Sequence, residues 1–306
     1  MIAYVFPGQG SQYSGMGKDL ADNFAVAKAV FDEANDALSF DLASLCFSGS
    51  EDELKLTANT QPAILTTSIA ALRVMEQEVD ISASYTAGHS LGEYSALVAS
   101  GVLSLADAVR IVRQRGTFMQ EAVPVGVGAM AAIIGIEAFD LDQLCREAAQ
   151  GEVVSPANYN SPGQIVIAGH ATAVDRAIHL AKERGAKRAL PLPVSAPFHS
   201  ALMAPAAERL EEELGTVKLN DFTCPVVSNV EAAPYADNNR VKPLLVKQVC
   251  APVRWEESVT NLCRQDVSHF VEIGPGKVLS GLIKRIDRSA KTQNIGDVQS
   301  LLKVQK

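Results

Sequence analysis

The chain has 306 residues, of which 47% are hydrophobic and 20% are charged, and its formal net charge is −8 at pH 7. This composition predicts a globular protein with a sizeable core, and the acidic balance argues against binding to nucleic acid. The five cysteines are scattered without CxxC spacing, which argues against a disulfide framework and a zinc site. Without an apolar run of about twenty residues or a basic leader, we expect a cytoplasmic protein that does not enter a membrane.

Apolar runs of strand length alternate with segments of helical period, which predicts an α/β fold with a mainly parallel sheet. Residues 2–6 are expected to form a buried first strand that opens into the glycine-rich turn 7–12. This turn fits neither nucleotide-binding template, because Tyr13 replaces the third glycine of one and Asp19 follows Gly17-Lys18 in the other. It is therefore expected to be a loop of exposed backbone N–H groups at the end of a strand.

The pentapeptide Gly88-His89-Ser90-Leu91-Gly92 follows a short apolar run. GxSxG is the outline of a nucleophile elbow, in which a sharp strand-to-helix turn exposes a serine hydroxyl at a helix N-terminus. The pattern alone is weak, because small residues occupy many such turns. Residues 91–100 strengthen it, because they form a good helix run that Gly101 closes. Ser90 is therefore the candidate nucleophile.

A capping box at residues 104–107 precedes a predicted amphipathic helix whose apolar face carries Arg115 and Met119. Burying an unpaired guanidinium is costly, so Arg115 is expected to pair with a carboxylate, extend its head to water, or reach a cleft. In a cleft, its planar fork would bind a substrate carboxylate with two hydrogen bonds.

The order of predicted elements changes between residues 126 and 194. The expected elements are strands at 128–134, 153–159, 164–168 and 187–192, helices at 140–150 and 172–184, and a turn at 160–163. This βαββαβ order is the ferredoxin-like motif. Strands at 225–228 and 269–273 then resume the earlier pattern. We expect a small ferredoxin-like subdomain, residues 126–194, inserted into a discontinuous large α/β domain, residues 1–125 and 195–306, with a peripheral tail from residue 289.

Five histidines compete to act as the base that a serine nucleophile needs. His89 adjoins the nucleophile, His170 begins a helix and His179 lies within one, so structural or surface roles are expected for all three. His269 opens a strand, where a packed or edge histidine is the default interpretation. His199 lies in an irregular segment where the chain re-enters the large domain, and such a loop can reach a cleft. We favour His199 over His269.

Several motifs occur in order over almost the whole chain, namely residues 6–12, Gln61-Pro62-Ala63, residues 88–96, Arg115-Gly116 and Gly274-Pro275-Gly276. Together they resemble the malonyl-CoA:acyl carrier protein transacylase family of bacterial fatty acid synthesis. They also resemble the acyltransferase domains of polyketide synthases, but the stand-alone length favours the transacylase. The resemblance implies a hydrolase-like core with a ferredoxin-like insertion.

The resemblance implies a role for each matching residue. Ser90 is the implied nucleophile and His199 the implied base, without an acidic third member. The backbone N–H groups of Gln9 and Leu91 would form the oxyanion hole, and a backbone carbonyl near Gln248 would orient the histidine. The implied cycle is ping-pong, with a malonyl-serine intermediate.

Arg115 would hold the malonyl carboxylate, and Met119 and Phe198 would contribute to the substrate site. Phe198-His199 is similar to a Phe-His pair in malonyl-selective polyketide acyltransferases, which favours malonyl over methylmalonyl. The implied partners are malonyl-CoA and acyl carrier protein. No cofactor or metal is expected, because the CoA thioester is a substrate and the phosphopantetheine belongs to the carrier protein.

Carrier proteins of this pathway are acidic like this chain, so docking would need a local basic patch. Two clusters are candidates, and a solvated surface is the alternative for each: Lys182, Arg184, Lys187 and Arg188, and Lys284, Arg285 and Arg288. Two other functions also remain open. A serine esterase or thioesterase would share GxSxG and use His269 as its base. The other is a non-catalytic subunit that binds carrier protein, and the presence of Ser90, His199 and Arg115 argues against it.

Overall fold

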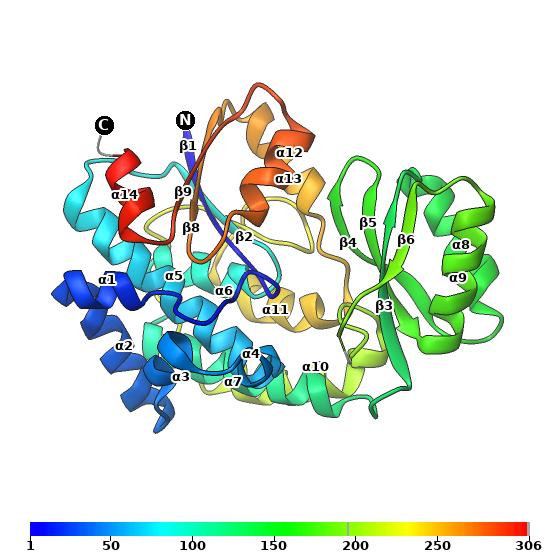
Figure 1. Ribbon diagram of the computed structural model, residues 1–306, viewed down its shortest axis with the longest axis horizontal. Helices are drawn as coiled ribbons and strands as arrows, with labels where there is room; N and C mark the ends of the chain where they lie inside the picture. Colours follow the sequence, from blue (N-terminus) through cyan, green and yellow to red (C-terminus); the bar gives the residue numbers. More distant parts are fainter. Residues whose placement is uncertain (195, 305–306) are drawn as a thin grey trace.

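The computed structural model describes residues 1–194 and 196–304, so the expected domain start at Ser195 and the last two residues of the expected tail lie outside the described residues. The chain forms two lobes, each built on its own β-sheet (Figure 1). The large lobe holds a parallel five-stranded sheet in the order β7-β2-β1-β8-β9, and the small lobe an antiparallel four-stranded sheet in the order β4-β5-β3-β6. This architecture confirms the predicted fold class.

The strands of the large sheet are β1 (Ile2–Phe6), β2 (Tyr85–Gly88), β7 (Val226–Val227), β8 (His269–Ile273) and β9 (Lys291–Ile295). Strand β1 lies at the centre, between β2 and β8, and is buried from Ala3 to Phe6. A strand covered on both faces needs a continuous apolar run, which its sequence supplies. Phe6 pairs with Gly88 in parallel register, so the loops that follow β1 and β2 both begin at the carboxyl ends of the strands, on the same side of the sheet.

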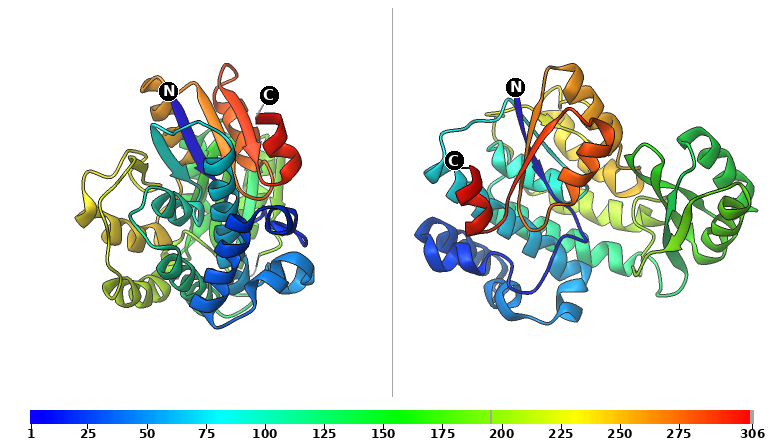
Figure 2. Two further views of the ribbon diagram at one scale, coloured as in Figure 1. Left: turned by 90° about the vertical axis from the view of Figure 1, so that its left-hand side faces the viewer. Right: turned by 45° about the horizontal axis from the view of Figure 1, so that its top comes forward.

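Helices surround the large sheet (Figure 2). The longest, α5, packs against α2 and α7. The helices of this lobe are α1 (Lys18–Asn23), α2 (Ala25–Leu38), α3 (Leu42–Ser48), α4 (Glu51–Lys55), α5 (Thr57–Glu78), α6 (Gly92–Ala99), α7 (Leu105–Glu121), α10 (Ala204–Gly215), α11 (Val241–Cys250), α12 (Trp255–Arg264), α13 (Val278–Ile286) and α14 (Val298–Val304), with 3-10 turns η1 (Ala201–Met203) and η2 (Asn238–Arg240). None of the helices in the described part of the chain combines the length and apolar character that a membrane span requires.

The small lobe follows the ferredoxin-like order, with both helices on the outer face of its sheet (Figure 1). Its elements are β3 (Gly128–Ile134), α8 (Ala138–Ala149), β4 (Val154–Ser161), β5 (Gln164–His170), α9 (Ala171–Glu183) and β6 (Arg188–Pro191). Its apolar cluster, which includes Ile133, Leu141 and Ile167, is separate from the main core. All four strands fall between residues 126 and 194, and on that basis we propose these residues as the boundaries of the subdomain.

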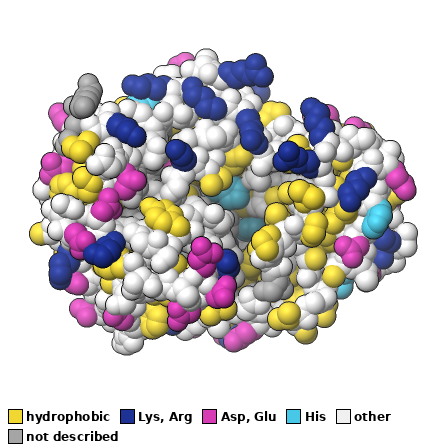
Figure 3. Space-filling model, viewed as in Figure 1, with side chains coloured by type: hydrophobic (Ala, Val, Ile, Leu, Met, Phe, Trp, Pro, Cys, Tyr) yellow, Lys and Arg dark blue, Asp and Glu magenta, His cyan; other side chains and the backbone are white. Residues whose placement is uncertain are grey.

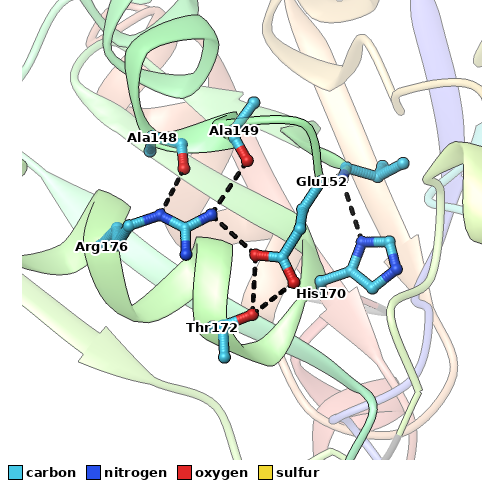
Figure 4. Close-up of polar contacts among 7 residues, drawn as sticks. Ala148, Ala149, Glu152, His170, Thr172 and Arg176 are labelled. Atoms are coloured by element: carbon cyan, nitrogen blue, oxygen red, sulfur yellow. Dashed lines mark hydrogen bonds and ion pairs between the residues drawn. The ribbon is translucent and has the colours of Figure 1, made fainter.

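Polar contacts at one end of the small lobe give His170 a structural role (Figure 4). The backbone N–H of Val153 donates to His170 Nδ1 at 2.9 Å. Beside it, Arg176 forms an ion pair with Glu152 at 2.7 Å and donates to the carbonyl oxygen of Ala148, at the end of α8. These hydrogen bonds and the ion pair connect α8, α9 and the end of β5.

Two expectations for local structure are wrong. The turn expected at residues 160–163 is narrower, because β4 continues through Ser161 across two register shifts opposite β5. The peripheral tail expected from residue 289 instead contributes β9, the edge strand beside β8, followed by α14. Its polar composition suits an edge strand that is only partly buried.

Strand β4 also connects the lobes. The backbone N–H of Tyr159 donates to the Val253 carbonyl oxygen, and the Val253 N–H donates to the Ala157 carbonyl oxygen, both at 2.9 Å. Val253 lies just before α12 in the large lobe. These two hydrogen bonds hold the small sheet beside the carboxyl ends of the large sheet's strands, where the loops after β1 and β2 begin.

Candidate active site

Ser90 lies in a sharp turn between β2 and α6, as the GxSxG pattern predicts. Its φ is 52°, a left-handed conformation that is uncommon for a residue with a side chain. The flanking glycines allow close backbone approach. A Cβ on Gly88 would lie 1.9 Å from the Gly92 carbonyl carbon, and a Cβ on Gly92 would lie 2.1 Å from the Phe6 carbonyl oxygen. Only glycine fits at these two positions.

Asn229, which follows the neighbouring strand β7, makes two hydrogen bonds to the backbone of this turn. Its Oδ1 accepts from the Ser90 N–H at 2.7 Å, and its Nδ2 donates to the Gly88 carbonyl oxygen at 2.6 Å. The side chain therefore bridges both sides of the strained residue. Sequence reasoning missed Asn229; the available signal was its position two residues after β7, at the same sheet edge.

His199 contacts the Ser90 hydroxyl from the segment that follows the small lobe. Its Nε2 lies 2.7 Å from Ser90 Oγ, and its Nδ1 lies 2.8 Å from the Gln248 carbonyl oxygen. A proton on Nδ1 that donates to this carbonyl leaves Nε2 free to accept the serine proton. Burial and the charge of Arg115 lower the pKa of His199 to about 3, so the imidazole is neutral at pH 7.

The structure places the other histidines elsewhere. His269 pairs with Ile2, at the amino ends of the parallel strands. Gly88 pairs with Phe6 at their carboxyl ends, and Ser90 follows Gly88. His269 and Ser90 therefore lie at opposite ends of the strands. His89 Nε2 lies 2.8 Å from Asn160 Oδ1 on β4. The esterase alternative, which needs His269 as its base, has no support in this geometry.

Arg115 is 2% exposed on α7 and lies beside the nucleophile. It donates through Nη1 to Gln61 Oε1 at 2.7 Å, and through Nη2 to Gln248 Oε1 at 2.9 Å and Ser90 Oγ at 3.2 Å. None of the ion pairs formed by the described residues includes Arg115, so of the three alternatives for this residue the pairing with a protein carboxylate is not observed. Burial lowers its pKa, and a carboxylate ligand would favour the charged form.

The residues named from the sequence meet at one cavity. It has a volume of about 130 Å³, and its lining includes Gln9, Ser90, Leu91, Arg115, Met119, Phe198 and His199. Within the described part of the chain, the backbone N–H groups of Gln9 and Leu91 donate to no other protein group. Gln248 is not among the residues that line this cavity. The sequence predicted a role for its backbone carbonyl but not the hydrogen bond between its side chain and Arg115.

A second cavity, of about 230 Å³, adjoins the first and shares four lining residues with it, namely Gln9, His89, Asn158 and Leu192. Helix α13 contributes Val278, Leu279 and Leu282 to its wall. On the surface, histidine side chains are visible in a hollow between the lobes, and lysine and arginine side chains gather along one side of it (Figure 3). The hollow places the histidine side chains within view of the solvent between the lobes (Figure 3).

Glu93 is a fully buried carboxyl group on α6 that sequence reasoning did not identify. Burial raises its pKa from 4.5 to about 7, although hydrogen bonds from Tyr235, Gln248 and Asn229 and the charge of Arg115 oppose this shift.

This shift predicts a pH-dependent difference in stability between Glu93→Gln and the unsubstituted protein. Because the folded pKa lies above the unfolded value, the contribution of Glu93 to stability is present below pH 4.5 and is lost as the pH rises through about 7. Over this window the free energy of unfolding is expected to fall by about 3 kcal/mol relative to Glu93→Gln. Denaturant unfolding of both proteins at several pH values measures the difference, and parallel pH profiles would contradict it.

Comparisons with known proteins agree with this geometry. The family model described as "Acyl transferase domain" matches residues 3–305. The malonyl CoA-acyl carrier protein transacylase of Bacillus subtilis is 53% identical over 301 residues, which cover 98% of this chain and 95% of the relative. The protein of the same name from Escherichia coli is 53% identical over 285 residues, with 93% and 92% coverage.

Two solved structures extend the agreement to the fold. The acyl carrier protein S-malonyltransferase of Vibrio cholerae superposes with a TM-score of 0.97 at 50% identity, and the match covers 99% of both chains. A malonyl-transacylase in complex with the acyl carrier protein of a type II polyketide synthase gives a TM-score of 0.96 at 48% identity, covering 99% of this chain and 98% of the other.

Proposed function

Because the chain belongs to the acyl transferase domain family, we propose that Ser90, His199 and Arg115 carry out its reaction in the cavity between the lobes. The protein is an acyl carrier protein S-malonyltransferase of fatty acid synthesis, which moves a malonyl group from malonyl-CoA to acyl carrier protein. One observation carries the residue assignment: the Ser90 hydroxyl oxygen is shared by the His199 imidazole at 2.7 Å and the Arg115 guanidinium at 3.2 Å.

Acylation begins when neutral His199 takes the proton of Ser90 and the serine oxygen attacks the thioester carbonyl of malonyl-CoA. The backbone N–H groups of Gln9 and Leu91 donate to the resulting oxyanion, each worth roughly 3 kcal/mol by analogy with other oxyanion holes. The protonated imidazole then gives its proton to the leaving CoA thiolate, and malonyl-serine remains.

Transfer to the carrier protein reverses these steps. His199 takes the proton of the phosphopantetheine thiol, and the sulfur attacks the carbonyl carbon of the malonyl ester. The bond from that carbon to Ser90 Oγ then breaks, and the protonated imidazole returns its proton to the serine oxygen. The second cavity offers a route for this narrow arm to the serine. Exchange between two similar thiols is nearly thermoneutral, so the enclosed site mainly has to keep water from the ester.

Arg115 supplies selectivity in this proposal. Its fork can pair with the free carboxylate of a malonyl group, and Met119 and Phe198 line the same cavity. An acetyl group lacks this carboxylate and therefore cannot form an ion pair with Arg115. Phe198 is a candidate residue for excluding the additional methyl group of methylmalonyl.

Intact mass measurement after incubation with malonyl-CoA tests the function. A stable mass increase by one malonyl group on the protein supports the transferase. Turnover of malonyl-CoA to free malonate would instead indicate a hydrolase, and the absence of any reaction would indicate a subunit that only binds carrier protein. Discharge of the adduct by phosphopantetheinylated carrier protein completes the test.

The two basic clusters differ in their position relative to the cavities. Arg184, which directly follows α9, forms an ion pair with Glu147 on α8, and both helices lie on the outer side of the small lobe (Figure 1). Lys284 and Arg285 are exposed on α13, which lines the second cavity. We propose that the α13 cluster, together with Arg288, meets the acidic carrier protein.

Arg285→Glu is expected to slow discharge of the malonyl-enzyme to carrier protein by about tenfold at low ionic strength, because like charges now meet. Acylation by malonyl-CoA should be unchanged, and rapid-quench kinetics separates the two steps. Lys182→Glu, an equal charge reversal on α9, is the matched control and should alter neither step. Equal effects of Arg285→Glu on both steps would count against this docking surface.

The cytoplasm is the proposed location of the protein. All five cysteines are free thiols, which is the usual state in a reducing compartment.

A further inference from the structure

Glu93 is a buried titratable group to which the acyl transfer described above gives no role. It lies three residues after the nucleophile and has no exposed surface. Three donors converge on its carboxylate: the Tyr235 hydroxyl, Gln248 Nε2 at 2.7 Å and the Asn229 backbone N–H at 3.1 Å. Because every one of these neighbours donates, the carboxylate anion is the form that satisfies them.

Gln248 connects Glu93 to Arg115. Its amide oxygen accepts from Arg115 Nη2 at 2.9 Å, while its amide nitrogen donates to the Glu93 carboxylate. The amide thus lies between a buried cation and a buried anion. The reverse orientation would place the amide N–H groups against the guanidinium and the amide oxygen against the carboxylate. Glu93 therefore determines which end of Gln248 faces the arginine.

A second connection leads from Glu93 to Ser90. Asn229, whose N–H donates to Glu93, bridges the Ser90 N–H and the Gly88 carbonyl oxygen with its side chain. Gln248 Nε2 also lies 3.0 Å from the Ser90 carbonyl oxygen. Glu93 therefore anchors the two residues that contact the left-handed backbone of the nucleophile.

We propose that Glu93 is a positioning residue of the acyl transfer, whose carboxylate orients Gln248 and Asn229 so that Arg115 and Ser90 keep their reactive arrangement. This inference rests on the proposed function. Burial of a carboxylate is unfavourable for folding, as the raised pKa of Glu93 indicates, and an apolar residue of similar size would avoid that cost. A role in the reaction accounts for a carboxylate at this position.

Glu93→Gln tests the proposal, because it keeps the volume but presents an amide N–H₂ group to donors that need an acceptor. At pH 8, the kcat/KM of acylation by malonyl-CoA is expected to fall by about tenfold or more, the effect of losing a hydrogen bond to a charged group. Acylation by acetyl-CoA should fall less, because it does not use the arginine. The preference for malonyl-CoA over acetyl-CoA is the decisive readout, since a general loosening of the fold would lower both rates alike.

Glu272→Gln is the matched control. Glu272 is also fully buried, but its carboxylate accepts from the backbone N–H groups of Leu279 and Ser280 at 2.9 and 2.7 Å. This variant should keep the malonyl preference whatever its thermal stability. If Glu93→Gln does not fold, Tyr235→Phe removes one donor to the carboxylate and should lower the preference by a smaller factor.

An unchanged preference in folded Glu93→Gln would overturn the positioning role, as would an unchanged preference in Tyr235→Phe if only that variant folds. Failure of the unsubstituted protein to form a malonyl adduct would overturn the proposed function instead. The two failures are therefore distinguishable.

Discussion

Ser90→Ala is expected to abolish the malonyl-enzyme adduct and to lower malonyl transfer by about a millionfold, the size of effect seen when a serine nucleophile is removed. The Ser90 hydroxyl oxygen is the atom that would carry the ester, and it contacts both His199 and Arg115. Alanine removes this oxygen but keeps a Cβ in the same strained backbone conformation, so the fold should persist. Intact mass after incubation with malonyl-CoA measures the adduct.

Ser95→Ala is the control for this experiment. Ser95 is a buried serine on α6, and its hydroxyl has no hydrogen-bond partner among the described residues. Its loss should leave the adduct intact. An adduct of undiminished yield in Ser90→Ala would place the nucleophile elsewhere in the chain.

Arg115→Ala is expected to lower the kcat/KM for malonyl-CoA by about 10²–10³-fold, because the substrate carboxylate would enter a buried site without a cation. Acetyl-CoA carries no such carboxylate and should be affected far less. The substitution also leaves the Gln61 and Gln248 amide oxygens without their donor, so some loss of thermal stability is expected. The ratio of the two substrates' kcat/KM values, measured below the melting temperature, isolates the role in selectivity.

Arg115→Lys refines this test. Lysine keeps the positive charge but lacks the planar fork that contacts Gln61, Gln248 and Ser90 together. A malonyl preference between those of the unsubstituted protein and Arg115→Ala is expected. If the alanine variant retained the full preference for malonyl-CoA, Arg115 would not bind the carboxylate.

Local sequence signals predicted the parts of the fold that depend on short-range chemistry. The bounds predicted for β1 and β3 agree with the structure because each is a run of mostly apolar residues that ends at a turn. The strand-to-helix turn at Ser90 was predictable because Gly88 and Gly92 are the residues that such a close backbone approach requires. Arg115 was notable as a charge on an apolar helix face, and it is buried.

Features that depend on distant parts of the chain were not predictable in the same way. Strand β9 has the polar sequence KTQNI, which lacks the apolar pattern of a strand and forms one because β8 offers a free edge. Asn229 and Glu93 are ordinary polar residues in the sequence. Their importance comes from contacts with residues more than 100 positions away, such as the bond between Asn229 and the Ser90 backbone.

The position of β1 at the centre of the sheet has a consequence for synthesis of the chain. Strand β1 is synthesised before both of its neighbours, and it pairs on one side with β2 but on the other with β8, which begins at His269. Until that late segment emerges, an apolar strand edge of β1 is without its neighbour and open to association with other nascent chains. Completion of the central sheet therefore waits until β8 has been synthesised, and a product that stopped at the end of the small lobe would retain an aggregation-prone edge.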